Sequence, residues 1–350
     1  MVDGTDGFEE GEMAQLTVDA VPPGKTTART RRTRSGPGWL RVFVTGLALW
    51  LATVLVTFLT GNANLVPTII LVGSFLVPVT FVVYAFSRAD AVLTAQRVFS
   101  AFVYGGVLGV LGASVLEAAF VRQPSTLGYL GVGLVEEAVK LAALWLLARR
   151  LPYFTARNGM VLGAAVGFGF AAFESAGYAF NALFTANGLS LLNVVETEAL
   201  RGILAPVGHG LWTAVLGGAL FATAARAPHG RPRLTGSLLG WFLLVTLLHG
   251  LWDASSGIAV WLTLLLTGTP TQWYLIGIGQ APNVTQLQVH LYTALSWLLL
   301  AVDAAVGLLV LGIRWHRARG RAVTGGWWTT TPTGTGPLVM APVHGVGILR

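Results

Sequence analysis

Residues 127–148 read LGYLGVGLVEEAVKLAALWLLA. This run has the length of a membrane-spanning helix, because a bilayer core of about 30 Å needs about 20 apolar residues. Three ionisable residues, Glu136, Glu137 and Lys140, interrupt it. A charge near mid-bilayer costs about 2.5–3.5 kcal/mol on insertion scales, so such residues usually pair with one another or serve a function. The stretch therefore predicts a transmembrane helix that faces other polar groups inside a bundle.

The rest of the sequence has the composition of a membrane protein. Of its 350 residues, 54% are hydrophobic and 11% are charged, whereas an ordinary soluble domain is about 25% charged. This composition excludes a soluble globular enzyme and a disordered chain. The sequence contains no cysteine, which excludes disulfides and thiolate metal sites, so any metal needs His, Asp or Glu as ligands.

Seven further stretches are long and apolar enough to cross a bilayer. We therefore predict an all-α, polytopic integral membrane helix bundle of about eight transmembrane helices. The seventh apolar run extends to Leu266, which predicts either one long tilted helix or a helix and a re-entrant piece broken near Ser255-Ser256-Gly257. Residues 185–200 and 268–285 are predicted to be outer loops. The predicted spans are 40–60, 65–86, 98–120, 127–148, 159–184, 201–224, 236–260 and 287–313.

The positions of the basic residues predict the orientation. If the N-terminus is cytoplasmic, 19 of the 22 lysines and arginines fall in cytoplasmic segments, where these residues accumulate. Both ends are therefore predicted inside, in a multi-pass protein of the plasma membrane. Topology accounts for the net charge of +7, so the predicted partner is the lipid bilayer and no nucleic acid is expected. Residues 1–38 are predicted to be a disordered cytoplasmic tail, 39–315 the transmembrane domain, and 316–350 a cytoplasmic Gly/Thr/Pro-rich tail.

Polar residues occur at similar depth in four consecutive spans. At about 1.5 Å per residue, they fall in one layer near the midplane, toward the outer half of the bilayer. Charges in a bilayer interior are expected to face each other rather than lipid. The sequence therefore predicts one polar pocket among spans four to seven. Its members are Glu136, Glu137 and Lys140 in span four, Glu174 in span five, His209 in span six, and His249 and Asp253 in span seven.

The spacing within the spans assigns directions to these side chains. Glu136 and Glu137 project about 100° apart on a helix, so one faces the pocket centre while the other flanks it. Lys140 lies one turn further along and is placed to neutralise one of them. In span seven, Asp253 follows His249 at i+4, where its carboxylate can hold the imidazole tautomer or share a metal.

Two local features indicate that spans six and seven serve the same pocket. His209-Gly210-Leu211-Trp212 recurs as His249-Gly250-Leu251-Trp252, with a glycine beside each histidine for close helix packing. Pro206 precedes the first copy and is expected to kink span six, which frees backbone carbonyls.

Several carboxylates and two histidines in one dry pocket suit a metal such as zinc, whose catalytic sites mix His and Glu ligands and leave a position open for water. A spare glutamate then acts as general base. A metal-free site fits the same residues. In that case a glutamate and a histidine activate water, and His249 or another donor stabilises the oxyanion. The residue types alone leave both chemistries open.

Four motifs in this order resemble the PrsW family of intramembrane proteases, distant relatives of the CAAX prenyl endopeptidases and bacteriocin-processing membrane proteases. The resemblance covers about residues 40–315, and its motif core is 127–260. It implies an intramembrane metalloprotease that cleaves membrane-anchored protein substrates, such as anti-sigma factors, in regulated proteolysis. The motifs are Glu136-Glu137-Ala138-Val139-Lys140, Phe170-Ala171-Ala172-Phe173-Glu174, Arg201…Pro206…His209 and His249-Gly250-Leu251-Trp252-Asp253.

The resemblance also implies roles for individual residues. A divalent metal, zinc by preference, is expected on Glu174, His209 and His249. Lys140 and Asp253 are expected to contact the catalytic residues without binding the metal or the water themselves. Glu174 stands where the prenyl-endopeptidase relatives have a histidine, and Asp253 where they often carry asparagine. The implied catalytic set is Glu136, Glu137, Glu174, His209 and His249.

Two alternatives from other functional classes stay open at this point. Intramembrane Glu, Lys and His also mark proton pathways, which would suit an ion-coupled transporter. Against it, the hydropathy shows no inverted repeat, and the polar residues cluster in consecutive spans rather than lining a route. A non-catalytic protein that binds membrane partners would carry the same motifs.

Overall fold

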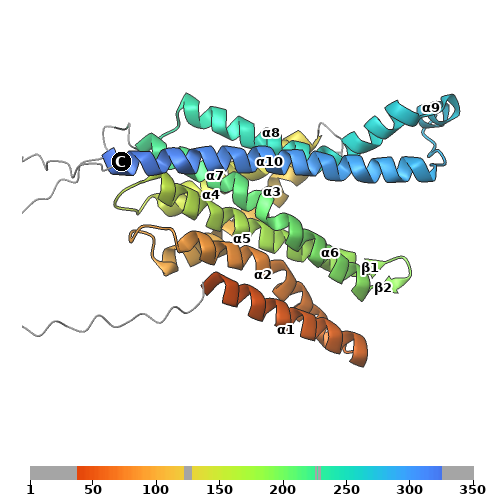
Figure 1. The fold of residues 1–350 in the computed structure, drawn as a ribbon, viewed down its shortest axis with the longest axis horizontal. Helices are drawn as coiled ribbons and strands as arrows, with labels where there is room; N and C mark the ends of the chain where they lie inside the picture. The colour runs from red at the N-terminus through yellow and green to blue at the C-terminus, as the bar shows by residue number, and fades with distance from the viewer. Residues whose placement is uncertain (1–37, 122–127, 225–226, 228–229, 325–350) are drawn as a thin grey trace, which may run out of the picture. The chain divides into compact units, whose positions relative to one another are not determined.

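The computed structural model describes residues 38–121, 128–224, 227 and 230–324. In this part of the chain the protein is an all-α, polytopic membrane helix bundle with one small β-hairpin (Figure 1). The elements are α1 (Gly38–Thr60), η1 (Ala63–Leu65), α2 (Val66–Phe86), α3 (Ala95–Phe120), α4 (Gly128–Ala148), α5 (Ala156–Ala182), β1 (Phe184–Thr185), β2 (Gly188–Leu189), α6 (Leu191–Leu204), η2 (Ala205–Val207), α7 (His209–Ala224), α8 (Gly236–Thr267), α9 (Pro270–Gly277) and α10 (Gln286–Thr324).

Seven of the eight predicted spans each coincide with one helix, and the sixth covers the end of α6, η2 and α7. Seven segments of the described chain are long and apolar enough to cross a membrane, with α6 to α7 counted as one. The remaining helix, α4, has 21 residues and contains Glu136, Glu137 and Lys140. The bundle is therefore confirmed, whereas the count of eight spans and the N-in/C-in orientation stay predictions.

The sixth span differs from its prediction. Residues 191–204, predicted to lie mostly in an outer loop, form helix α6, whose N-cap Ser190 accepts from the backbone N–H of Asn193. Glu198 of this helix is buried and accepts a hydrogen bond from Ser74 Oγ at 2.6 Å. The helical path is interrupted at η2, which contains Pro206, and α7 begins at His209. The predicted kink is thus a complete break between two helices.

The remaining boundaries are also informative. Helix α8 runs without interruption through Ser255-Ser256-Gly257, so the single long helix is the correct alternative. The predicted loop at 268–285 contains α9, which starts with a capping box of Thr269 and Gln272. Helix α10 continues past the predicted domain end at residue 315 to Thr324. The predicted tails otherwise lie outside the described residues.

Helix α5 is the centre of the bundle and contacts α2, α3 and α7. Its small residues allow this close approach. A Cβ atom at Gly163 would collide with the carbonyl oxygen of Thr213, and one at Gly167 with that of His209, both in α7. Since His209 starts α7, the contact at Gly167 fixes the height at which this histidine meets α5.

Leucines cover the outer faces of the bundle. Leu59, Leu108, Leu265 and Leu309 are 76%, 55%, 74% and 64% exposed. Water would disfavour apolar surface on this scale, and soluble monomers rarely show it. Lipid is therefore the expected surrounding of these faces.

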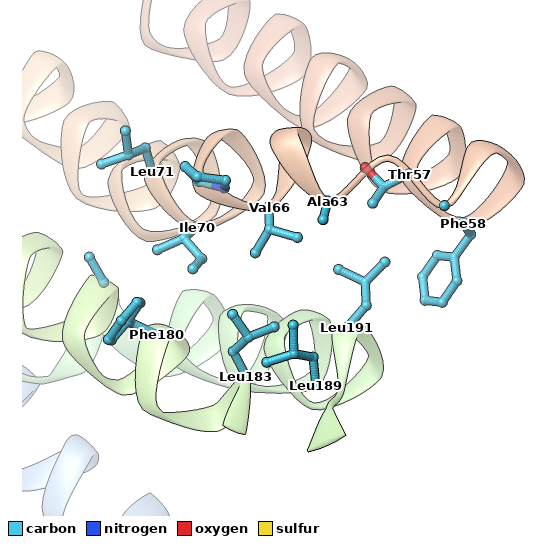
Figure 2. Close-up of a pocket in the computed structure, with 13 residues that line it drawn as sticks. Thr57, Phe58, Ala63, Val66, Ile70, Leu71, Phe180, Leu183, Leu189 and Leu191 are labelled. Carbon is cyan, nitrogen blue, oxygen red and sulfur yellow. The ribbon is translucent and has the colours of Figure 1, made fainter. Parts of the chain in front are cut away.

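An apolar cavity of about 780 Å³ lies between the end of α1, the start of α2 and the hairpin region (Figure 2). Ile70, Phe180, Leu183 and Leu191 are among the side chains that point into it. None of its described lining residues is titratable. The cavity is therefore separate from the predicted polar pocket, although Ala176 in its wall follows Glu174 by two residues on α5.

The glycine contact between α5 and α7 gives a stability prediction. Gly163→Ala is expected to destabilise the protein by about 1–3 kcal/mol, the usual cost of overpacking, because the obstacle is backbone and cannot rotate away. Gly177→Ala on the same helix has nothing within 4 Å of its new Cβ and should be neutral or stabilising, because alanine favours helix. Thermal unfolding of both variants in detergent measures the difference, and equal melting temperatures would contradict this packing.

Candidate active site

Four helices bring the predicted polar residues together near the middle of the bundle. Helix α4 contributes Glu136, Glu137 and Lys140, α5 contributes Glu174, and α8 contributes His249 and Asp253. His209 is the first residue of α7, directly after the break at η2. Contacts among their charged or imidazole groups link all seven side chains.

The Lys140 ammonium lies at the centre of this cluster. Its Nζ is 2.9 Å from Glu136 Oε2, 2.9 Å from Glu137 Oε1 and 2.8 Å from His209 Nδ1. The Phe170 ring lies beneath it, with Nζ 3.9 Å from the ring centroid. Lys140 is 0% exposed. The lysine therefore contacts both glutamates, whereas the sequence predicted that it would neutralise one.

The hydrogen bond with Lys140 determines the tautomer of His209. A lysine ammonium has donors only, so His209 Nδ1 is the acceptor and the ring proton is on Nε2. This Nε2 lies 3.0 Å from Glu174 Oε2, which accepts its proton. Arg201 Nη2 donates to the same oxygen, and Arg201 Nε donates to Ser175 Oγ at 2.6 Å. Glu174 and Arg201 thus orient the imidazole from the side away from Lys140.

His249 is oriented in a corresponding way by Glu137. Its Nδ1 lies 3.0 Å from Glu137 Oε1, the oxygen that also accepts from Lys140. We infer that Nδ1 carries the proton, which leaves the lone pair on Nε2. That nitrogen is 3.6 Å from Glu136 Oε2 and 3.4 Å from Asp253 Oδ2. The Trp212 ring stacks on the imidazole with centroids 4.7 Å apart, which fixes its plane.

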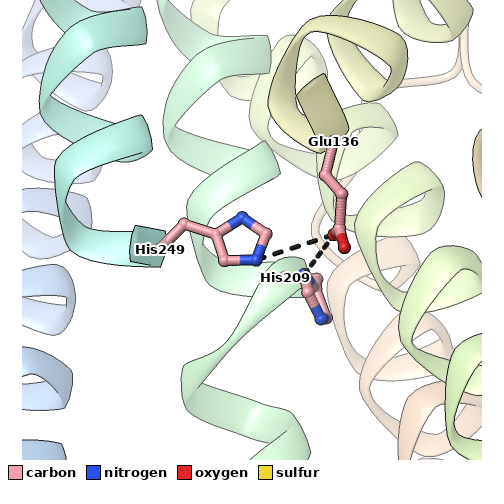
Figure 3. A group of neighbouring side chains, drawn as sticks. All are labelled: Glu136, His209 and His249. Carbon is pink, nitrogen blue, oxygen red and sulfur yellow. Dashed lines mark ion pairs between the residues drawn. The ribbon is translucent and has the colours of Figure 1, made fainter. Parts of the chain in front are cut away.

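One set of three side chains lies close enough together to hold a metal ion. Ligand atoms of Glu136, His209 and His249 all lie within 4.8 Å of one another, and Figure 3 shows the two rings directed at the carboxylate. The chemistry fits a divalent metal, because zinc sites combine His and Glu ligands. The second nitrogen of each ring is held by a carboxylate, Glu174 or Glu137, as in metal sites where an outer carboxylate orients the histidine.

This arrangement of motifs agrees with the comparison to known families. Residues 36–278 match the family model described as PrsW family intramembrane metalloprotease. The chain belongs to this family. The match extends from the start of α1 to the end of α9 and contains all the predicted site residues. Neither the curated proteins nor the solved structures gave a match.

Within this PrsW family member, the group of residues that could hold a metal differs from the predicted metal set in one residue. The sequence placed Glu174 on the metal with the two histidines. In the structure Glu136 completes the group of three, while Glu174 contacts His209 through Nε2, the nitrogen opposite the one facing Glu136. Asp253 Oδ2 lies 3.4 Å from His249 Nε2, the nitrogen that also faces Glu136. The roles expected of Asp253 and of the other site residues stay predictions.

Sequence reasoning gave no site role to three residues that contact the cluster. Arg201 binds Glu174, Phe170 lies under Lys140, and Trp212 stacks on His249. All three lie within the quoted motifs or the His-Gly-Leu-Trp repeat, so these patterns could have indicated that they belong to the site. The repeat suggested helix packing, but the first of its two tryptophans contacts both histidines.

The shared oxygen of Glu137 gives a second stability prediction. Glu137→Ala removes one acceptor from Lys140 and the acceptor of His249, both buried. Breaking a buried ion pair costs about 3–5 kcal/mol, so unfolding in mixed detergent micelles should show a loss of that size. Glu196→Ala, on the exposed face of α6, is the control and should stay within about 0.5 kcal/mol. A similar loss in the two variants would contradict the buried network.

Proposed function

We propose that this protein is a metal-dependent endopeptidase of the plasma membrane. It hydrolyses peptide bonds of membrane-anchored proteins in regulated proteolysis, with anti-sigma-factor-like proteins as candidate substrates. The observation that carries the proposal is the approach of Glu136, His209 and His249 to within 4.8 Å of one another, inside a membrane bundle. Family membership supports the reaction class.

The formal charge of the cluster supports a divalent metal. Glu136, Glu137, Glu174 and Asp253 provide four carboxylates, whereas Lys140 and Arg201 provide two cations. With neutral imidazoles the balance is two negative charges. Unbalanced charge is costly in a low-dielectric interior, and a divalent cation would offset it.

Each side chain has a distinct task in this proposal. A metal on Glu136, His209 and His249 would activate water and polarise the scissile carbonyl. Glu137 keeps the proton on Nδ1 of His249, and Glu174 keeps the proton on Nε2 of His209. Asp253 is partly open, with 26% of its side chain exposed. Its Oδ2, beside His249 Nε2, is the group we propose to accept a proton from water and return it to the leaving amine.

The first functional prediction concerns cleavage in membranes. Host membranes with the wild type should contain new protein N-termini near membrane anchors. Glu136→Gln should lower their formation at least about 10²-fold, the lower end of the contribution of a general base, because activation of water would depend on this carboxylate as metal ligand or as base. Glu196→Gln, on the exposed face of α6, is the matched control and should behave as the wild type. The measurement is a comparison of protein N-termini at equal expression.

The same experiment separates the other functional classes. Identical N-termini in the wild type and Glu136→Gln, with both proteins folded and abundant, would contradict the peptidase. Solute uptake into liposomes that depends on Glu136 would then favour the carrier. Substrate capture without cleavage would favour the non-catalytic binder.

A second prediction tests the metal. Purified protein in liposomes is tested on a substrate found by the comparison of N-termini. Its cleavage should fall at least about 10-fold after chelation, because the metal would activate the attacking water, and should return when Zn²⁺ is added. Metal content measured on the same sample should follow the activity. Full activity after complete chelation would favour the metal-free mechanism, in which Glu136 acts as the base.

A further inference from the structure

The ammonium of Lys140 contacts two of the three ligand atoms in the candidate metal set. Its Nζ is 2.9 Å from Glu136 Oε2 and 2.8 Å from His209 Nδ1. A neutral imidazole has one lone pair in its plane at the unprotonated nitrogen. Zinc binds such a nitrogen at about 2.0–2.1 Å. The lone pair of His209 Nδ1 can therefore serve the lysine or the metal, but not both.

From this exclusion we propose that Lys140 is a built-in counter-cation of the metal centre. In the metal-free protein its ammonium pairs with Glu136 Oε2 and His209 Nδ1, and it therefore occupies the two ligand atoms that the metal needs. A divalent metal binds when the ammonium leaves His209 Nδ1 and Glu136 Oε2. Lys140 is then a positioning residue that sets metal affinity, and this role rests on the metal dependence proposed above.

The displaced ammonium of Lys140 would keep favourable contacts with Glu137 and Phe170. Its contacts with Glu137 Oε1 and with the Phe170 ring do not involve the metal set. Glu137 Oε2 is buried and has no hydrogen-bond partner among the described residues. A small movement of Nζ around the Glu137 carboxylate would exchange Glu136 and His209 for this second oxygen. The lysine thus keeps an anionic partner while the metal set is released.

The displacement can be observed in the wild-type protein because the sequence contains only two lysines, Lys25 and Lys140. Lysine labelled with ¹³C at Cε gives two NMR signals in detergent or nanodiscs, and Lys25→Arg assigns them. Adding Zn²⁺ should shift the Lys140 signal in proportion to bound metal and leave the Lys25 signal unchanged. In His209→Ala, the Zn²⁺-dependent shift should be lost.

A variant provides the second test. Lys140→Met has similar length without charge. It should bind Zn²⁺ more tightly than the wild type by about ten-fold or more, because like charges repel strongly in a low-dielectric site. Lys140→Arg keeps the charge and should stay close to the wild type. Competition with a chromophoric chelator measures the three affinities.

The outcomes distinguish this inference from the proposed function. One Zn²⁺ bound per chain through His209, with an unchanged Lys140 signal or with equal affinity in Lys140→Met, would overturn the counter-cation role while leaving the metallopeptidase intact. If neither the wild type nor Lys140→Met binds Zn²⁺, both the counter-cation role and the metal dependence are overturned. Cleavage that persists after chelation would then identify a metal-free peptidase.

Discussion

An ammonium group that is fully removed from solvent must be surrounded by acceptors, because an uncompensated buried ion costs several kcal/mol. Lys140 finds Glu136 and Glu137 on its own helix and His209 on α7. This requirement links the helices of the site. Glu137 continues the network to His249 on α8, and His209 continues it to Glu174 on α5. Apolar packing, being non-directional, would let these helices rotate, whereas the chain of hydrogen bonds fixes which face of each helix is turned inward.

The architecture could be predicted from the sequence because lipid imposes simple rules on helix length and charge. Runs of about 20 apolar residues located every described span of the bundle. The prediction was wrong where backbone hydrogen bonds and packing, rather than hydropathy, decide whether a segment is helical. Residues 191–204 are polar enough to resemble a loop, yet they form α6, with Glu198 buried against Ser74. At Ser255-Ser256-Gly257 the sequence left a single long helix and a broken helix as alternatives. A helix inside a bundle tolerates small residues, and α8 continues through them.

The membership of the polar cluster followed from depth alone, because helical rise converts residue number into height. Depth alone did not predict which carboxylate contacts which histidine nitrogen. Which nitrogen of a histidine faces a metal depends on the partner of the other nitrogen, and that partner lies on a different helix. Glu174 meets Nε2 of His209 and Glu137 meets Nδ1 of His249, which leaves Glu136 between the two remaining nitrogens. The rotation of α4 and α5 about their axes decides whether Glu136 or Glu174 lies between the two histidines. The sequence alone does not give that rotation.

The position of Lys140 also bears on how the site would stay folded without the proposed metal. Glu136 and Glu137 next to each other in a dry interior would repel each other and pull water or lipid headgroups inward. One internal cation reduces that repulsion at every stage of assembly, because it is on the same helix one turn away. In the proposed function, a dication would bind the carboxylate of Glu136 with greater charge and would displace the ammonium. The arrangement therefore reconciles two demands that otherwise conflict: a stable fold without metal and a high-charge ligand set ready to receive it.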